Sequence, residues 1–377
     1  MKKLASWRMH HTVVLLLWVG GMACSKNGSN LPAENDTPPA TIDSRYPTNL
    51  IIDSVSLSIL SSAITANAQL ASAYNTIVAE PAASALARAI QPVASGNSDN
   101  FSSISNQAND CRLLAAHWLY LRKNKPTESH AYYNKLVSTL LAWVNVGNSA
   151  TTHLPNETAY LGFFEAYSAI RSKLSATDRA RIDNWLIARA EVFRNFPPRV
   201  NNWETIRLTF LYYLGYILQS PQLLNHAETA YGTLLNVNLL PGGKSEDLVD
   251  RDAFAYHAYN LSFYGRILRA KHNFEGEAIM KNFRDRMNNI NVCLQDMVDY
   301  WQPFLTSPAT NVHIEFVNTH YAPDKQRSDY NKPYQPASSV YALEELLLPF
   351  PEAKEYLELI TGGNRFNRKL SGFLYWP

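Results

Sequence analysis

From about Ile51 onward, apolar residues recur mainly at spacings of three and four, which is the periodicity of amphipathic helices. One helix is predicted after Pro126 and ends at Gly147; its apolar stripe comprises Tyr133, Leu136, Val137, Leu140, Leu141 and Val144. Another begins at Ser175, which has Asp178 three positions later as in a capping box, and ends at Pro197-Pro198. The pattern therefore predicts a mainly helical chain.

Further helical segments are joined by short turns that contain Pro, Gly or Asn, so neighbouring helices are expected to pack antiparallel. These segments are 52–80, 104–123, 156–174, 202–218, 221–236, 252–272, 275–300 and 337–348. They show no constant repeat length of the kind that solenoids have. We therefore predict an all-α fold, a single-domain (α/α) toroid that forms an incomplete barrel of helical hairpins over residues 51–377.

The least helical stretch is 303–335. Within it, residues 313–318 alternate in polarity and carry β-branched side chains, so they are expected to form either an extended segment or a buried loop.

The N-terminus has the layout of an export signal. Lys2, Lys3 and Arg8 precede a short apolar run, which ends in small residues before Cys24. Residues 1–23 are predicted to be a signal peptide, and 24–50, rich in Asn, Pro, Ser and Thr, a flexible tether lipidated at Cys24. Ordinary secretion with an incidental Cys24 is the alternative. The expected location is the periplasm or the cell surface of a bacterium, with membrane attachment through the lipid only.

Composition narrows the possible partners. Thirty-four Lys and Arg residues face 32 Asp and Glu residues, a formal net charge of +2, so no broad basic field favours nucleic acid. Any anion must be bound at a local site. Cys111 and Cys293 lie in separate apolar segments without zinc-type spacing, so both are expected to be buried thiols. A single disulfide between them is the alternative. We predict no metal site and no cofactor.

The segment most suggestive of chemistry runs from 241 to 260. A glycine turn leads into an acidic helix start, where Asp250 is a candidate cap. On one continuous helix, Tyr256, Tyr259 and Asn260 would share a face, with Arg251 about one and a half turns earlier. Positive potential at such a helix start would favour a bound carboxylate or a phenolate.

A second segment, Asn201-Asn202-Trp203, follows the Pro197-Pro198 stop directly. An N-cap explains one of the two asparagines but not the pair beside a tryptophan.

With these motifs the chain resembles the alginate lyase family of helical polysaccharide lyases. In that family an Asn-Asn-His stretch precedes a helix entered through an Arg and a Tyr-His pair. This chain has Asn201-Asn202-Trp203, then Arg251 and Tyr256-His257, in the same order and at similar spacing. The resemblance covers about 104–272, with a weaker echo at 313–318. It implies cleavage of a uronate-containing acidic polysaccharide, alginate or a related polyuronate, by β-elimination.

The resemblance also implies roles for individual residues. Asn202 and Arg251 would neutralise the uronate carboxylate and stabilise the charge that develops beside it. Tyr256 would act as the acid and is a candidate for the base, because an adjacent cation stabilises a phenolate. His257 completes the candidate catalytic group.

The candidates for substrate binding are Asn201, Trp203, Arg207, Tyr259 and His313. For Tyr259, packing of the ring in the core is the favoured explanation. The irregular stretch adds secondary candidates, which are Glu315, Asn318, His320 and Arg327.

Trp203 departs from the family pattern, which has a basic histidine at that position. An indole N–H only donates, so Trp203 cannot accept a proton. Three possibilities follow: Tyr256 makes both proton transfers, another histidine such as His257 or His313 substitutes, or the protein binds sugar without cleaving it.

Two other classes of protein compete with a lyase. One is a catalytically degenerate, lyase-like protein that binds glycans at the cell surface. The other is an α/α-barrel glycoside hydrolase, which needs two carboxylates at a defined separation. The acidic residues Glu246, Asp247, Asp250 and Asp252 are better explained as charges at a helix start.

Overall fold

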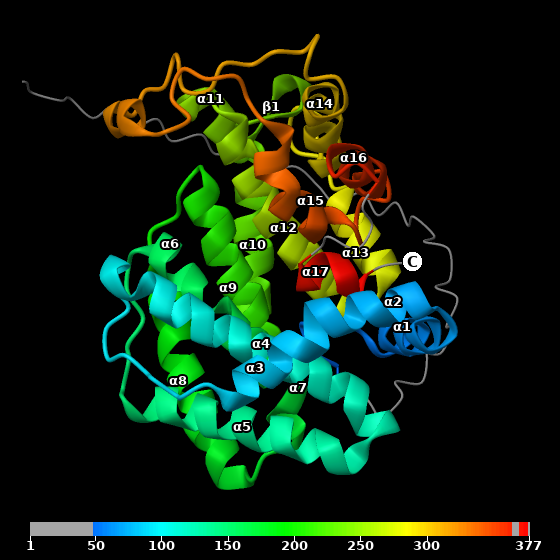
Figure 1. The fold of residues 1–377 in the computed structure, drawn as a ribbon. Coiled ribbons are helices and arrows are strands. Elements are labelled where there is room, and N and C mark those ends of the chain that lie inside the picture. The colour runs from blue at the N-terminus through cyan, green and yellow to red at the C-terminus, as the bar shows by residue number, and fades with distance from the viewer. Residues whose placement is uncertain (1–47, 364–368, 376–377) are drawn as a thin grey trace, which may run out of the picture. The chain divides into compact units, whose positions relative to one another are not determined.

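Helices form nearly all the regular structure of residues 48–363 and 369–375, the part of the chain that the computed structural model describes (Figure 1). The first half contains α1 (Ser54–Ala66), α2 (Ala68–Tyr74), α3 (Glu80–Ala87), α4 (Phe101–Asn124), α5 (Pro126–Asn145), α6 (Leu154–Glu157), α7 (Leu161–Ile170) and α8 (Ala176–Asn195). The second half contains α9 (Asn202–Leu218), α10 (Pro221–Asn238), α11 (Glu246–Arg251), α12 (Phe254–Glu275), α13 (Glu277–Arg284), α14 (Leu294–Thr306), α15 (Val340–Leu346), α16 (Ala353–Ile360) and α17 (Leu370–Leu374). The all-α fold predicted from the sequence is confirmed.

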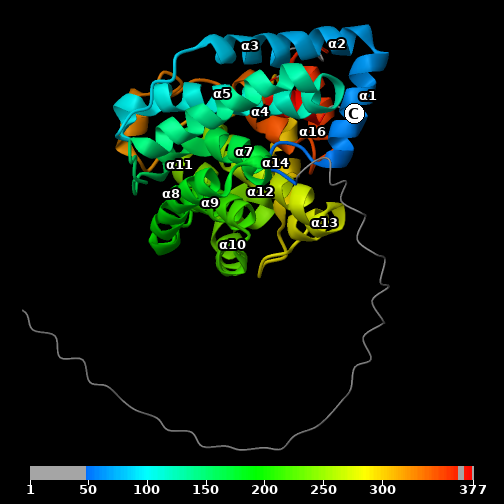
Figure 2. The ribbon, with the colours of Figure 1, turned by 90° about the horizontal axis from the view of Figure 1, so that it is seen from below.

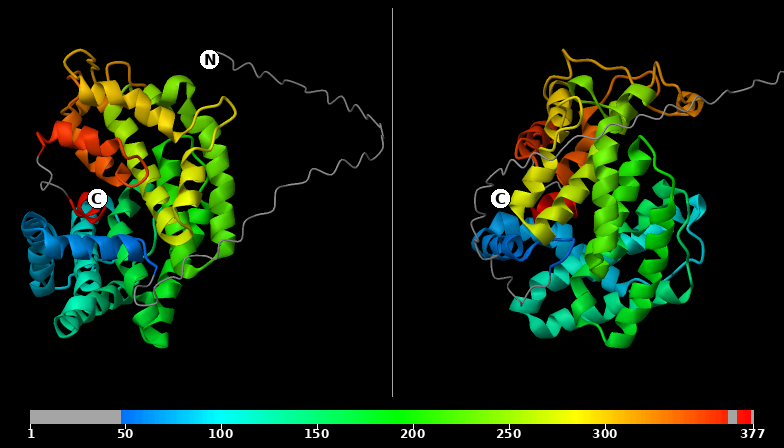
Figure 3. Two further views of the ribbon diagram at one scale, coloured as in Figure 1. Left: turned by 90° about the vertical axis from the view of Figure 1, so that its right-hand side faces the viewer. Right: turned by 180° about the vertical axis from the view of Figure 1, so that it is seen from behind.

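The helices form an inner and an outer set. The inner helices contact one another in the order α4, α7, α9, α12 and α15, and they are buried on most of their faces. The outer helices α5, α8, α10 and α13 pack against this set, each through a narrower stripe of buried residues. Helix α3 lies against α4 and α5 (Figure 2), and α9 lies beside both α10 and α12 (Figure 3). This paired arrangement is the predicted (α/α) toroid.

Local sequence signals explain where several helices begin and end. Ser175 caps α8 by accepting a hydrogen bond from the Asp178 N–H at 3.1 Å, and the helix stops just before Pro197. Helix α5 starts at Pro126, whose missing N–H costs nothing in a first turn, and Gly147, with φ of +66°, follows its end. Both predicted helices are confirmed.

Two predictions about continuous helices are wrong. The segment 275–300 is divided into α13 and α14, because residues 285–293 are not helical. Arg251 and Tyr256 do not share a helix either, because Asp252 adopts a left-handed backbone with φ of +49° and ends α11 before α12 starts. The cap of α11 is Ser245, not Asp250.

The irregular region carries little strand. The strands β1 (Leu239–Leu240) and β2 (Lys244–Ser245) form a two-residue hairpin around the glycine turn. In the stretch 307–335, Ile314 makes an isolated antiparallel bridge with Pro333, and Phe316 has φ of +66°. Residues 313–318 therefore form a loop anchored by backbone hydrogen bonds rather than a strand.

Several predictions from the N-terminal sequence concern residues outside this range. The predicted signal peptide, Cys24 and nearly all of the tether lie outside the described residues. Among the residues described, no helix is both long and apolar enough to span a membrane. Cys111 and Cys293 are buried free thiols, so the alternative of a disulfide between them is not found.

Candidate active site

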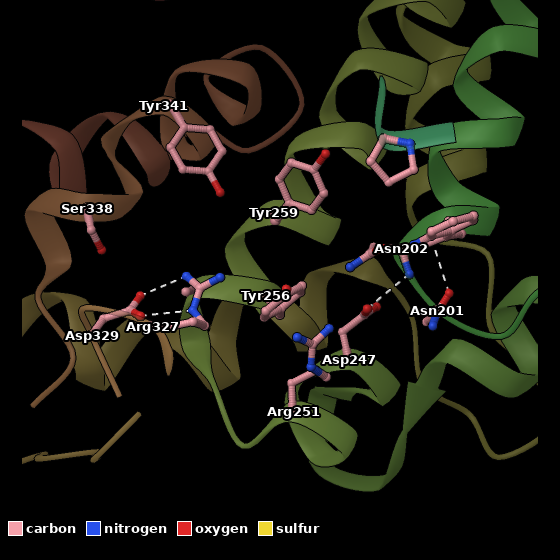
Figure 4. Close-up of a pocket in the computed structure, with 13 residues that line it drawn as sticks. Asn201, Asn202, Asp247, Arg251, Tyr256, Tyr259, Arg327, Asp329, Ser338 and Tyr341 are labelled. Atoms are coloured by element: carbon pink, nitrogen blue, oxygen red, sulfur yellow. Dashed lines mark hydrogen bonds and ion pairs between the residues drawn. The ribbon is translucent and has the colours of Figure 1, made fainter. Parts of the chain in front are cut away.

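One cavity of about 480 Å³ lies where the start of α9, the helix α11, the start of α12 and the segment before α15 meet (Figure 4). A cavity of this size accommodates a small part of a larger ligand. Its lining is rich in aromatic, amide and charged side chains, and comprises Pro155, Asn201, Asn202, Trp203, Asp247, Arg251, Ala255, Tyr256, Tyr259, Arg327, Asp329, Ser338 and Tyr341.

The two asparagines at the start of α9 have different roles. Asn201 is the N-cap, and its side-chain oxygen accepts a hydrogen bond from the Trp203 N–H at 3.3 Å. Asn202 as a whole residue is only 4% exposed, and its side-chain amide makes no hydrogen bond with any residue that the structure describes. Figure 4 shows it directed into the cavity between Tyr256 and Tyr259. A buried amide without a protein partner is available to a ligand.

Arg251 and Tyr256 meet although they lie on separate helices. The guanidinium carbon of Arg251 is 3.9 Å from the centre of the Tyr256 ring, in cation–π geometry. Arg251 is held there by Asp324, which accepts hydrogen bonds from its Nε, at 2.6 Å, and from its Nη2. The bent chain at Asp252 therefore brings cation and phenol together more closely than one straight helix would.

A second arginine lies near the same tyrosine. The guanidinium carbon of Arg327 is 5.6 Å from the centre of the Tyr256 ring, and Asp329 holds its Nε and Nη2 at 2.9 Å each. In both Arg251 and Arg327, the third nitrogen, Nη1, has no carboxylate acceptor among the described residues. Two oriented guanidinium groups thus retain donors for an anion at the cavity wall.

The carboxyl groups of the cavity are engaged with the protein. Burial raises the pKa of Asp247 to about 7, against hydrogen bonds from the Asn202 N–H at 3.0 Å and the Asn238 amide, which favour the ionised form. The hydrogen bonds from Arg327 lower the pKa of Asp329. Neither carboxylate is free to act on a ligand without breaking these contacts.

The other two tyrosines of the cavity differ from Tyr256 in their surroundings. Burial raises the pKa of Tyr259 to about 12, although a hydrogen bond with Thr158 and the charge of Arg266 oppose the shift. Burial also raises the pKa of Tyr341. Both phenols are therefore harder to ionise than an ordinary tyrosine.

A buried polar network supports the cavity from behind. Asn238, at the end of α10, donates to Asp247 and to the Val200 carbonyl, and it accepts from the Asn260 amide at 2.6 Å. Asn260 in turn accepts from the Thr205 hydroxyl at 2.7 Å. The network ties α9, α10, α11 and α12 together directly beneath the functional side chains.

Glu315 fixes the start of α12 from the irregular loop. Its carboxylate accepts hydrogen bonds from the Phe254 N–H at 2.9 Å and the Ala255 N–H at 3.1 Å, so it serves as an N-cap supplied from a distant position. Burial raises its pKa to about 7. Because Tyr256 follows directly, this contact sets the position of the phenol.

Comparisons with known proteins bear on the family and the fold of the chain. The sequence profile of the alginate lyase family matches residues 92–309, more than half of the chain. The chain belongs to the alginate lyase family. Its fold is similar to that of a crystal structure of an alginate lyase from Bacteroides ovatus, with a TM-score of 0.63 and 11% sequence identity over 88% of this chain and 100% of that chain. No curated protein matches the sequence.

As a member of the alginate lyase family, the protein is a polysaccharide lyase, and its substrate class is acidic polysaccharide. This membership does not favour a degenerate sugar-binding protein. A retaining or inverting glycoside hydrolase needs two carboxyl groups that act on the substrate. The two carboxyls that line this cavity, Asp247 and Asp329, are both bound to protein donors, so the cavity does not offer such a pair.

The structure brings most of the predicted site residues together. Asn201, Asn202, Trp203, Arg251, Tyr256 and Tyr259 all line the cavity.

Three other candidates do not line it. His257 is fully buried, with its Nδ1 2.8 Å from the Ser245 hydroxyl and its Nε2 3.1 Å from the Met297 carbonyl. Burial lowers its pKa to about 4. Arg207 is 1% exposed and paired with Glu204, and the Nε2 of His313 lies 3.0 Å from the Asp252 carbonyl oxygen. We therefore leave these three out of the proposed site.

Several cavity residues were missed or ranked low from the sequence. The sequence pattern predicts Asp247 to be a helix-start charge, but Asp247 is 2% exposed and holds the start of α9. Arg327 was only a secondary candidate, and Asp329, Ser338 and Tyr341 were not identified. These residues come from a loop without periodicity, so no sequence pattern indicates which of them face the cavity.

Proposed function

We propose that this cavity cleaves a uronate-containing polysaccharide, alginate or a related polyuronate, by β-elimination, with Tyr256 as both base and acid. The observation that carries the proposal is the set of available donors around one phenol. The Asn202 amide makes no hydrogen bond, and the Nη1 groups of Arg251 and Arg327 have no carboxylate acceptor, within the described residues; all three side chains line the cavity.

The chemistry requires such donors. The carbon beside a uronate carboxylate is a very weak acid until the carboxylate charge is neutralised, because its deprotonation places a second negative charge next to the first. Amide and guanidinium groups that bind the carboxylate stabilise the enolate-like charge of the transition state. The positions of Asn202, Arg251 and Arg327 around Tyr256 support them as the groups that bind this carboxylate.

The proton transfers follow from the same arrangement. The ionised phenol of Tyr256 takes the proton from the carbon beside the carboxylate, the bond to the neighbouring glycosidic oxygen breaks, and a carbon–carbon double bond forms. Tyr256 then returns the proton to the departing oxygen. One residue that makes both transfers requires proton and leaving group to lie on the same face of the sugar ring.

The other residues considered as the base can be excluded, which supports Tyr256 in that role. Trp203 cannot accept a proton, Asp247 and Asp329 are bound to protein donors, and burial raises the pKa of Tyr259 and Tyr341. His257 and His313 do not line the cavity. Tyr256 alone combines access to the cavity with two neighbouring guanidinium groups.

The proposed setting is outside the cytoplasm. The signal layout before Cys24 supports export and lipid attachment, with residues 24–50 as a tether for the domain 51–377.

The proposed function is tested by incubating the soluble part, from about residue 50, with alginate, glucuronan and other polyuronates. β-Elimination leaves an unsaturated uronate at the new non-reducing end, which absorbs in the ultraviolet. We expect that absorbance to rise together with reducing ends on at least one polymer. Reducing ends without absorbance would indicate hydrolysis, and neither signal on any polymer would contradict the proposal.

A further inference from the structure

A second depression is linked to the cavity through Phe196, which lines the depression and contacts Trp203 of the cavity wall. It has a volume of about 560 Å³, its wall is mostly apolar, and it is lined by Thr152, Glu191, Val192, Asn195, Phe196 and Pro197. We call it the trough. It is more open than the cavity and lies at the end of α8 and the loop before α6.

An aromatic ridge separates the two hollows. The Trp203 ring, which lines the cavity, stacks on Phe196, which lines the trough, with ring centres 6.3 Å apart and planes at 29°. His153 packs edge-on against Trp203 at 5.2 Å. Within this ridge His153 is exposed and Trp203 is half-buried, whereas Phe196 is only 7% exposed, so His153 and Trp203 form its accessible part.

The ridge carries donors that the protein does not use. The Nδ1 of His153 accepts a hydrogen bond from the Asn156 N–H at 3.3 Å, so in the neutral ring the proton sits on Nε2, which has no acceptor among the described residues. The indole N–H of Trp203 has no acceptor among the described residues. Such a surface offers a sugar ring an apolar face for stacking and donors for its hydroxyls.

A cationic side chain, that of Arg199, lies beside Phe196 of the trough. Arg199 is exposed, and its guanidinium carbon lies 5.6 Å from the centre of the Phe196 ring. No carboxylate of the described residues pairs with it, since only its backbone N–H bonds to Glu204. The one acidic side chain of the trough, Glu191, is paired with Arg194 at 2.6 Å. The trough is therefore compatible with a negatively charged occupant.

We propose that the ridge and trough form a distal subsite for the polyuronate chain, in which a sugar stacks on Trp203 and a carboxylate beyond the cleaved bond pairs with Arg199. This inference rests on the proposed function, because the chain that fills the trough is the one cleaved in the cavity. The subsite also gives Trp203 a role. Trp203 stands where the family pattern has a basic histidine, and its ring would support the substrate by stacking instead of accepting a proton.

The subsite predicts a dependence on substrate length. In Arg199→Ala, KM for a uronate hexasaccharide should rise by up to about five-fold, the upper end of the range expected for an exposed ion pair. The trisaccharide, which is too short to fill both hollows, should show no change, and kcat should stay the same for both. His153→Asn should act in the same direction, since asparagine keeps the capping acceptor for the Asn156 N–H while removing the ring.

The matched control is Arg181→Ala. Arg181 is also an exposed arginine, but it lies near the start of α8, away from the trough, and contacts Asn145 and Asp178. Its removal should leave the kinetics of both oligosaccharides unchanged. Equal effects of Arg199→Ala on the two lengths, or no effect on either, would overturn the subsite.

Calorimetry separates the subsite from the proposed chemistry. In a Tyr256→Phe background, the hexasaccharide should bind more tightly than the trisaccharide, and Arg199→Ala should narrow that difference. If the wild type formed no unsaturated product but this binding pattern held, the proposed function would fail and the subsite would stand. If the wild type cleaved both lengths and the binding difference were absent, the function would stand and the subsite would fall.

Discussion

The side chain of Asn202 differs from its neighbour Asn201 in having no hydrogen-bond partner in the part of the protein that the structure describes. Asn202 is nearly completely buried, yet its amide finds no acceptor or donor among the described residues, whereas Asn201 next to it is used as a helix cap. Because Asn202 lines the cavity, its unpaired amide is accessible from there, and a ligand can complete its hydrogen bonds.

Asn202→Ala tests this interpretation. The change removes the amide but neither the backbone N–H that binds Asp247 nor the cap at Asn201. We expect kcat to fall by about 10²–10³, as for removal of one donor to a developing oxyanion, with the thermal midpoint of unfolding little changed. Asn201→Ser, which keeps a capping oxygen, is the control and should lose much less activity. Equal kinetics for the two variants would remove Asn202 from the carboxylate site.

At this scale the sequence predicts the residues that lie in motifs and misses those that depend on the path of the loop. Asn202, Arg251 and Tyr256 belong to local patterns, and all three line the cavity. Arg327 reaches Tyr256 only because the loop 307–335 folds back over α12, held by contacts such as Arg251 with Asp324. Conversely, His257 follows a candidate tyrosine in sequence but faces the core, since adjacent residues on a helix point about 100° apart.

Among the elements, the joint between α9 and α11 controls the geometry of the cavity. Asp247 on α11 accepts the first N–H of α9, and Asn238 links the same carboxylate to α10. The sequence predicts α9 and an acidic helix start near residue 246, but neither the separate helix α11 nor this joint, because it gives no measure of how deeply an acidic residue at a helix start is buried. Asp247 is 2% exposed, and burial raises its pKa to about 7.

The joint predicts a pH dependence. Ionised Asp247 holds the Asn202 N–H more strongly than the protonated form does, so activity should rise with pH through about 7. In Asp247→Asn this rise of activity with pH should be absent, and the activity at pH 8 should be lower than that of the wild type. Stability should change in the opposite sense: because the folded pKa lies above the ordinary value of 3.8, the contribution of the aspartate to stability falls as pH rises from 3.8 to about 7.

Two measurements check this prediction. Profiles of kcat against pH for the wild type and Asp247→Asn should differ in the limb near pH 7. The difference in free energy of unfolding should shift in favour of the variant over the same interval. An unchanged acidic limb in the variant would assign that limb to another group.

For the whole molecule, a buried cluster of charges connects distant parts of the chain. Glu165 on α7 and Glu345 on α15 are bridged by Arg266 and Arg269 of α12, and Arg112 of α4 also pairs with Glu165. Burial alone would raise the pKa of Glu345, but the three arginines outweigh it and lower the pKa to about 2. Periodicity predicts the inner helices but not this cluster, since charged residues on a helix are ordinarily expected at its surface.

Glu345→Gln should destabilise the fold by about 3–5 kcal/mol at neutral pH, because it leaves buried arginines without their counter-charge. Since the folded pKa of Glu345 lies below its ordinary value of 4.5, its stabilising effect is fully present above pH 4.5 and is lost as pH falls toward 2. The difference between wild type and variant in denaturant unfolding should shrink over that range. Glu277→Gln, at an exposed pair with Lys281, should change little at any pH.

The most direct test of the account is the ultraviolet absorbance formed from a polyuronate by Tyr256→Phe, compared with the wild type and Tyr259→Phe. The two tyrosines lie one helical turn apart in the same cavity, but only Tyr256 stacks against Arg251. We predict that Tyr256→Phe binds oligosaccharide with nearly unchanged affinity but forms no unsaturated product, while Tyr259→Phe keeps most of the activity. Wild-type rates of product formation by Tyr256→Phe would contradict the account.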